Sequence, residues 1–506
     1  MVHLLPLLLA LPLTGFQQPH APAAVEDQQE APAQPIPEPL ALVSSGSVEV
    51  AAGALEYEVS LRDFELRNEE GEVHAHMTAF AYVVAGEDPA TRPVTFAFNG
   101  GPGSASVWLH MGLLGPRRVA VPSDAANAGA PPYPLVSNPH TLLTHTDLVF
   151  VDPIGTGFSR AVGSASDEDF WGVDEDVESV AAFVREWLTR NGRWGSPKYV
   201  LGESYGGVRG ALLGQALKQH NASVALNGLL FVSPAFDIQF VDGREDDLTY
   251  VTSLPTYAAT ALYHGALTAT DEDQESFLAR VRTFASGPYL SALYAGEALA
   301  PERRAEVIAG LARFTGLSED YWDRANLRVN AARFRKELLR DRGLVLGRLD
   351  MRYRGSDIDA VGESPASDPM FSGIGSAYVA AFQTYTQGEL GIDLPGRAYN
   401  FSNESVFGQW KRSEAGTTAF AGWLDTVPAL AAAMRDNPAL RVYCANGWFD
   451  VATTVAAAEY NLSRPGIDAQ RVTVRNYQAG HMMYVHEPSL EAMAADLREF
   501  YDAAGH

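Results

Sequence analysis

A serine between two glycines stands where a short apolar run gives way to a helical segment. The run Tyr199–Leu201 is followed by Gly-Glu-Ser-Tyr-Gly at 202–206, with Ser204 at the centre, and then by the apolar segment Val208–Leu213. This G-x-S-x-G pattern is typical of a nucleophile elbow, a sharp strand-to-helix turn that exposes the serine hydroxyl. The glycines would let the strand and the helix pack closely. The pattern predicts a serine nucleophile, and because Gly and Ser are common residues, its context must support it.

A serine nucleophile of this type requires a histidine that follows a later strand. Five of the twelve histidines come after Ser204, namely His220, His264, His481, His486 and His506. His481 follows the strand-like segment 472–477, so its imidazole could reach back to the serine. His486 competes with it, but His486 precedes Glu487-Pro488, where a solvated loop or a helix start is expected. We therefore predict that His481 is the general base.

The acid is expected after the preceding strand, at 440–445. The loop that follows offers one carboxylate, Asp450. An alternative role for Asp450 is to cap the amino terminus of a helix predicted at 451–460. In the predicted triad, His481 removes the proton of Ser204, while Asp450 fixes the imidazole tautomer and stabilises its cationic form.

Such chemistry also needs N–H donors for the oxyanion that forms during attack. One donor is normally the residue after the nucleophile, here Tyr205. The other is expected from a loop after an earlier strand, and the glycine-rich segment Asn99–Ser104 follows the apolar run 94–98. A tight turn without a ligand is the alternative for that segment taken alone.

The strands that must position these residues are visible as short apolar runs, which are typical of strands buried on both faces. The runs are 94–98, 148–151, 199–201, 229–232, 440–445 and 472–474. Alternation within 47–59 and an extended pattern over 73–84 predict an antiparallel edge. Residues 175–190 have helical apolar spacing. The expected architecture is α/β, an α/β-hydrolase fold with a mostly parallel central sheet.

The buried-strand pattern stops after about residue 238 and resumes after about 415. Helical segments are predicted between them at 271–284, 301–317 and 318–342. The predicted organisation is a signal peptide at 1–23, a flexible linker at 24–40, a first core part at 41–238, a mainly helical cap at 239–415 and a second core part at 416–506. The apolar run at 4–13 is too short to span a bilayer. We therefore expect an exported protein, periplasmic or secreted, with no membrane span.

Composition limits the partners. The formal net charge of −25 over 506 residues, with no cluster of Lys and Arg, argues against nucleic acid. The single cysteine, Cys444, cannot form an internal disulfide and is expected to be a small buried apolar residue. His74 and His76 share one face of a strand without a nearby third ligand, so no metal site is expected. Oligomeric state is left open.

Four ordered segments resemble the sequence blocks of the serine carboxypeptidases, the family that includes cathepsin A and carboxypeptidase Y. The segments are Asn99–Ser104, Val149–Ser159, Gly202–Gly207 and Ala479–Met482. The resemblance covers the core on both sides of the predicted cap. It implies a cofactor-free peptidase that releases single residues from peptides with a free C-terminal carboxylate, often best at acidic pH.

The resemblance also assigns roles. In the family, the positions of Asn99, Gly100 and Glu203 hold the terminal carboxylate of the substrate, and those of Gly101 and Tyr205 form the oxyanion hole. A protonated Glu203 could donate a hydrogen bond to a carboxylate that an anionic one would repel.

This chain departs from the family pattern at Leu113 and at Thr453. Leu113 stands where the family has a second glutamate, so Glu203 is expected to lack a carboxylate neighbour that raises its pKa. Thr453 replaces a cysteine often found after the catalytic aspartate.

Residues 352–354, Arg-Tyr-Arg, are interpreted as a local charged patch of the cap. An esterase or acyltransferase with the same triad, or a non-catalytic peptide-binding relative, is the alternative function.

Overall fold

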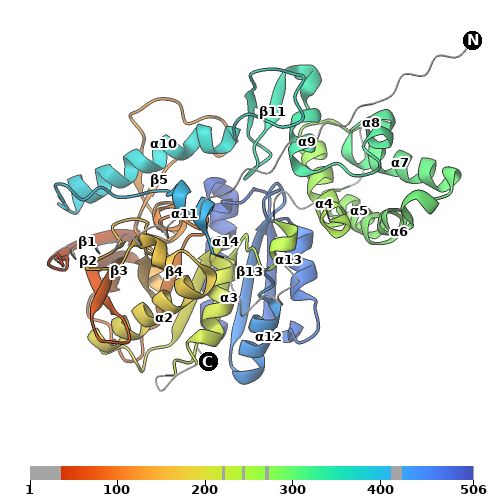
Figure 1. Ribbon diagram of the computed structural model, residues 1–506. Coiled ribbons are helices and arrows are strands. Elements are labelled where there is room, and N and C mark those ends of the chain that lie inside the picture. The colour runs from red at the N-terminus through yellow and green to blue at the C-terminus, as the bar shows by residue number, and fades with distance from the viewer. Residues whose placement is uncertain (1–35, 219–222, 242–245, 268–272, 412–423, 505–506) are drawn as a thin grey trace, which may run out of the picture.

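A large mixed sheet forms the centre of the protein, with helices on both faces (Figure 1). The computed structural model describes residues 36–218, 223–241, 246–267, 273–411 and 424–504. The predicted signal peptide and most of the predicted linker lie outside these residues. The first strand begins at Ala41, directly after the predicted linker. Among the helices described, none has the length and apolar character needed to cross a membrane.

The sheet has an antiparallel edge and a parallel body. Across the sheet the strands are β1 (Ala41–Val50), β2 (Gly53–Arg67), β3 (Val73–Val84), β7 (Asp147–Val151), β4 (Val94–Phe98), β9 (Lys198–Glu203), β10 (Gly228–Val232), β13 (Arg441–Gly447) and β14 (Val472–Tyr477). The strands from β7 to β14 run parallel, whereas β1, β2, β3 and β7 pair antiparallel. Short β8 (Arg160–Ala161) joins β3. This order confirms the predicted α/β-hydrolase fold.

Two apolar cores lie on opposite faces of the sheet. The first includes residues of α2 (Val173–Arg190), α3 (Gly206–Ala216) and α12 (Val427–Asp436). The second includes residues of α1 (Val107–Leu109), α10 (Pro369–Gln383) and α14 (Glu487–Ala504). Cys444 on β13 is fully buried in the first core, as predicted. The parallel strands are apolar throughout because both of their faces are covered.

A third apolar core lies among helices between β10 and β13. The helices that contribute to this core are α4 (Asp247–Tyr263), α5 (Gln274–Phe284), α6 (Leu290–Ala295), α7 (Pro301–Thr315), α8 (Glu319–Arg324) and α9 (Ala331–Glu337). Short β11 (Leu344–Leu346) and β12 (Arg354–Ser356) form a hairpin after them, and α11 (Glu404–Gln409) follows α10. The third core also contains Trp448 and Phe449, which follow β13. The helical segment is thereby packed onto the loop at the end of that strand.

One predicted helix is wrong. The prediction of a continuous helix at 318–342 is replaced by α8 and α9 with a turn between them. Asn326 and Leu327 have φ of 50° and 64°, in the left-handed region, which a right-handed helix cannot contain. Asn330 begins the second helix by accepting a hydrogen bond from Arg333 N.

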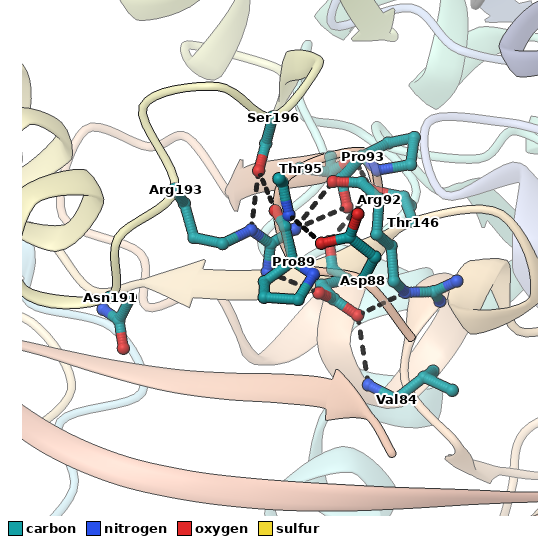
Figure 2. Close-up of polar contacts among 12 residues, drawn as sticks. Val84, Asp88, Pro89, Arg92, Pro93, Thr95, Thr146, Asn191, Arg193 and Ser196 are labelled. Atoms are coloured by element: carbon teal, nitrogen blue, oxygen red, sulfur yellow. Dashed lines mark hydrogen bonds and ion pairs between the residues drawn. The ribbon is translucent and has the colours of Figure 1, made fainter. Parts of the chain in front are cut away.

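A buried ionic cluster ties the amino ends of the central strands together (Figure 2). Asp147, the first residue of β7, accepts hydrogen bonds from Arg92 Nε at 2.7 Å and from Arg193 Nη1 at 2.6 Å. Arg193 also donates to Ser196 Oγ and to the Arg92 carbonyl. Because parallel strands share a direction, this cluster lies at the amino ends of the parallel strands. The candidate catalytic residues lie at the opposite, carboxyl ends.

Candidate active site

Ser204 lies in a sharp turn between β9 and α3. Its φ is 61°, in the left-handed region, which costs an L-residue about 1–2 kcal/mol. Backbone hydrogen bonds hold the turn: Ser204 N donates to Val232 O, and Ser204 O accepts from Gly207 N and Ala235 N. A Cβ at Gly202 would lie 2.1 Å from the Gly206 carbonyl oxygen, so the strand and helix approach as closely as the elbow pattern predicted.

His481 and Asp450 form a buried pair on the loops after β14 and β13. His481 Nδ1 lies 2.7 Å from Asp450 Oδ2, and the two side chains are 5% and 0% exposed. This pairing engages Nδ1 and leaves Nε2 for a second partner. The competing histidine, His486, precedes α14, where its Nδ1 lies 2.7 Å from Ser489 Oγ. It therefore has the helix-start position expected of it.

Asp450 is held in one orientation by its own loop. Its Oδ1 accepts from Ala452 N at 2.8 Å and Thr453 N at 3.1 Å, and Thr453 Oγ1 donates to its Oδ2 at 2.7 Å. The alternative role of helix cap is wrong, because α13 (Val455–Leu462) begins later, with Thr454 at the N-cap position. Oδ2 is thus the oxygen that faces His481.

The glycine-rich turn after β4 packs against the elbow. A Cβ at Gly100 would lie 2.4 Å from Tyr205 N and 2.9 Å from Ser204 Cβ, so only a glycine fits there. Asn99 anchors the turn on its other side, because its Oδ1 accepts from Leu109 N at 3.0 Å. The turn and the Tyr205 N–H are therefore adjacent, as an oxyanion hole requires.

A buried ion pair that sequence reasoning missed supports this turn. Arg209 on α3 donates to Asp176 on α2, with Nε–Oδ2 at 2.7 Å, and its Nη1 donates to the Asn99 carbonyl at 2.8 Å. The guanidinium also lies over the Tyr205 ring, 5.7 Å from its centroid. Two helices and the turn are thereby joined. Helical spacing places Asp176 on the inner face of α2, but nothing in the sequence pairs it with Arg209.

Glu203 lies beneath the elbow, 3% exposed. Burial raises the pKa of Glu203 to about 7. Tyr484 Oη donates to its Oε2 at 2.8 Å, and hydrogen bonds from Tyr484 and Asn99 oppose the shift. The absence of a second glutamate at Leu113 therefore does not leave this carboxyl with an ordinary pKa, because desolvation disfavours its anion. Tyr484 was not singled out from the sequence, although it lies three residues after His481.

The electrostatic environment of His481 contains opposing effects. Burial alone would lower the pKa of His481, but the Asp450 carboxylate, its hydrogen bond and the nearby Glu203 raise the pKa above 6.5. The charge of Arg348 lowers the pKa of His481. The charges of Glu203 and His481 are therefore coupled.

One cavity of about 750 Å³ joins these groups. Its walls include the polar residues Asn99, Glu203, Ser204 and His481, with the Gly100, Gly101 and Tyr205 segments beside them. Its apolar walls include Trp108, Met370, Phe371, Ile374, Phe407 and Trp410. Asp450 lies behind His481, fully buried. A serine, an imidazole–carboxylate pair and backbone donors are the groups that acyl transfer requires, and here they lie at one apolar cavity beside a carboxyl with a raised pKa.

Comparison with known proteins gives the same family as the sequence blocks. Residues 68–270 match the family model for serine carboxypeptidase. Serine carboxypeptidase-like 8 of Arabidopsis thaliana is 29% identical over 169 residues, which cover 32% of this chain and 37% of that protein. Serine-type carboxypeptidase F of Aspergillus niger is 34% identical over 115 residues, covering 22% of this chain and 19% of that protein. The alignments thus span well under half of either relative.

A solved structure aligns with more of the chain than these relatives do, but at lower sequence identity. A proline iminopeptidase from Mycobacterium smegmatis is 13% identical, covers 88% of this chain and 98% of its own, and has a TM-score of 0.37. The family match contains the elbow and the glycine-rich turn, and the order of the elements beyond it continues the same fold. Residues 68–270 of this chain are thus similar to the serine carboxypeptidase family.

Proposed function

We propose that this protein is a serine-type carboxypeptidase that releases C-terminal residues from peptides through an acyl-enzyme intermediate. The observation that supports this most strongly is the meeting of Ser204, His481 and Glu203 at one cavity. A nucleophile with a base serves any acyl transfer, whereas a buried carboxyl with a pKa near 7 beside them suits recognition of a carboxylate.

In the proposed mechanism, His481 Nε2 takes the hydroxyl proton as Ser204 Oγ attacks the carbonyl carbon of the last peptide bond. The N–H groups of Tyr205 and Gly101 donate to the oxyanion that forms. His481 then gives the proton to the departing amine, the C–N bond breaks and the C-terminal amino acid leaves. Water, deprotonated by His481, hydrolyses the ester to regenerate Ser204. Asp450 stabilises the imidazolium in both halves of the reaction.

The terminal carboxylate is proposed to bind the Glu203 carboxyl, the Asn99 side chain and the Gly100 N–H. Neutral Glu203 donates its proton in a hydrogen bond, whereas its anion would repel the substrate. Fixing the terminus there sets the distance to the bond that Ser204 attacks, so that only the last residue is released.

The test compares N-blocked dipeptides that differ only at the carboxyl end. We expect a peptide with a free carboxylate to be cleaved with a kcat/KM at least ~10²-fold above that of its C-terminal amide, because the amide cannot accept the same charge-assisted hydrogen bonds. A matched methyl ester measures triad chemistry alone. Equal kcat/KM for acid and amide would refute carboxypeptidase action and favour a general esterase or acyltransferase.

The pH dependence of Glu203→Gln tests carboxylate recognition. In the wild-type protein, kcat/KM for a free-acid peptide should fall as pH rises through about 7, where Glu203 loses its proton. Glutamine donates at every pH, so the variant should lose this alkaline decline. The acid limb should change much less, because Glu203 is already protonated and uncharged there in the wild type.

The amide or ester substrate is the control for this variant. Its kcat/KM should lack the decline near pH 7 in the wild type, since no carboxylate has to bind. An alkaline decline that persists in Glu203→Gln would assign the titration to another group.

Export and domain organisation complete the proposal. We assign residues 1–23 to a cleaved leader, 24–40 to a linker and 239–415 to an insertion that shapes the cavity. Cavity-lining Arg348, Met370, Phe371, Phe407 and Trp410 come from that insertion. The proposed substrates are therefore peptides outside the cytoplasm.

A further inference from the structure

The loop between β11 and β12 contacts both loops that hold the acid and the base. It comprises residues 347–353 and belongs to the segment between β10 and β13. We propose that Asp350 in this loop is a positioning residue for His481, acting through the backbone of Gly480. The proposal rests on the function proposed above.

The contacts on the base side are direct. His481 N donates to the Leu349 carbonyl at 2.6 Å, and Gly480 N donates to Asp350 Oδ2 at 3.0 Å. A Cβ at Gly480 would lie 2.4 Å from both Asp350 Cβ and Leu349 O. The two backbones are in close contact, so a shift of Asp350 must move the residue next to the imidazole.

The acid side is held by the same loop. Met351 N donates to the Phe449 carbonyl at 2.9 Å, and Val451 N donates to the Arg348 carbonyl at 3.3 Å. These two contacts flank Asp450 on both sides. The loop thus holds the imidazole and its carboxylate partner relative to each other, independently of their own hydrogen bond.

Asp350 is fixed by a buried ion pair. Arg352 Nη2 lies 2.6 Å from Asp350 Oδ2, and Arg352 Nε lies 3.1 Å from Oδ1. The residues are 0% and 4% exposed, so Arg352, predicted to belong to a local charged patch of the cap, is buried. A desolvated, bidentate pair restrains the carboxylate more strongly than a single solvated contact.

The loop is anchored from a third direction. Asp368, the N-cap residue of α10, accepts from Arg348 N at 3.1 Å and from Leu349 N at 3.3 Å through Oδ2. The Met351 carbonyl lies 2.7 Å from His264 Nε2. The loop is therefore a fixed part of the fold, and Asp350 presents its oxygen to Gly480 from a rigid support.

Two double variants with equal charge isolate this acceptor. Asp350→Asn with Arg352→Met removes both charges but keeps a side-chain oxygen for the Gly480 N–H. Asp350→Ala with Arg352→Met removes that oxygen as well. We expect the alanine pair to lose about ten- to a hundredfold in kcat, with KM changed less than threefold, because a displaced imidazole impairs proton transfer more than peptide binding. The asparagine pair should stay within about threefold of wild type.

The second readout is the rate at which a fluorophosphonate labels Ser204, per folded molecule. It should fall with kcat in the alanine pair. Asp147→Asn breaks another buried ion pair, at the far edge of the sheet, and should lower the melting temperature without slowing labelling. Should the alanine pair fail to fold, Arg352→Lys, which keeps the charge but loses the bidentate geometry, should still slow labelling severalfold.

The outcomes separate the two proposals. If the wild-type protein does not label at Ser204, the proposed function fails. If it labels, and the alanine pair or, in its place, Arg352→Lys reacts at the wild-type rate, Asp350 has no positioning role. Equal losses in the alanine and asparagine pairs would likewise overturn the role of the Gly480 hydrogen bond.

Discussion

Ser204→Ala is expected to lower kcat for peptide cleavage by about 10⁶-fold, the loss typical of removing the nucleophile from a serine triad. The fold should be unaffected, because the hydrogen bonds that hold the elbow use the backbone of Ser204 and not its hydroxyl. Steady-state release of the C-terminal amino acid from a blocked dipeptide measures the loss.

Binding and labelling provide the controls for this variant. The peptide should still bind with a similar Kd, since the proposed carboxylate contacts remain, and fluorophosphonate should no longer react. Ser405→Ala, at an exposed position on α11, should retain full activity. Residual activity above about 1% of wild type, after inhibition of any wild-type contaminant, would exclude Ser204 as the nucleophile.

Asp450→Asn is expected to reduce kcat by about 10⁴-fold. Asp450 Oδ1 accepts two backbone N–H groups, from Ala452 and Thr453, so the asparagine oxygen should occupy that position. Its NH₂ group would then face His481 Nδ1 and require that nitrogen to accept. The proton would move to Nε2, which could no longer take one from Ser204.

The readout for Asp450→Asn is kcat together with the circular dichroism and melting temperature of the variant. Nearly unchanged folding with a large loss of kcat is the expected pair of results. A decrease of less than tenfold would mean that another acid orients His481. Asp468→Asn, which alters a carboxylate outside the site, is the matched control.

The strands of the sheet could be predicted because burial restricts them to apolar residues. Strands such as β4 and β10 are buried on both faces, so they appear as uninterrupted apolar runs. The residues of the predicted triad lie at the ends of such runs, and the elbow turn has a defined glycine requirement. Local pattern and tertiary position coincide at these points.

The helical segment was harder to predict because its boundaries depend on tertiary contacts. The turn at Asn326 and Leu327 interrupts a helical pattern without a glycine or proline to mark it. The sequence around Arg352 is like that of a surface segment. Its burial depends on the ion pair with Asp350, which lies against the loops that follow β13 and β14. Neither the turn nor the ion pair is marked in the sequence by a periodic pattern or a motif.

The acidity of Glu203 could not be predicted for a related reason. The family pattern indicated that a second glutamate is missing at Leu113, and so predicted the pKa of Glu203 from neighbouring charge. Burial of the carboxyl away from water is the larger cause of its raised pKa. Burial depends on side chains such as Tyr484 from the far end of the chain.

The order of β9, β10, β13 and β14 has a consequence for biosynthesis. Ser204 and its turn are translated long before β14, which is among the last elements of the chain and precedes His481. In a growing polypeptide, the predicted nucleophile is therefore present without its predicted base until β14 and the loop after it have been made. In the proposed mechanism, the order of synthesis alone would keep the nascent chain inactive, and a product truncated before residue 481 is expected to be inert toward peptides.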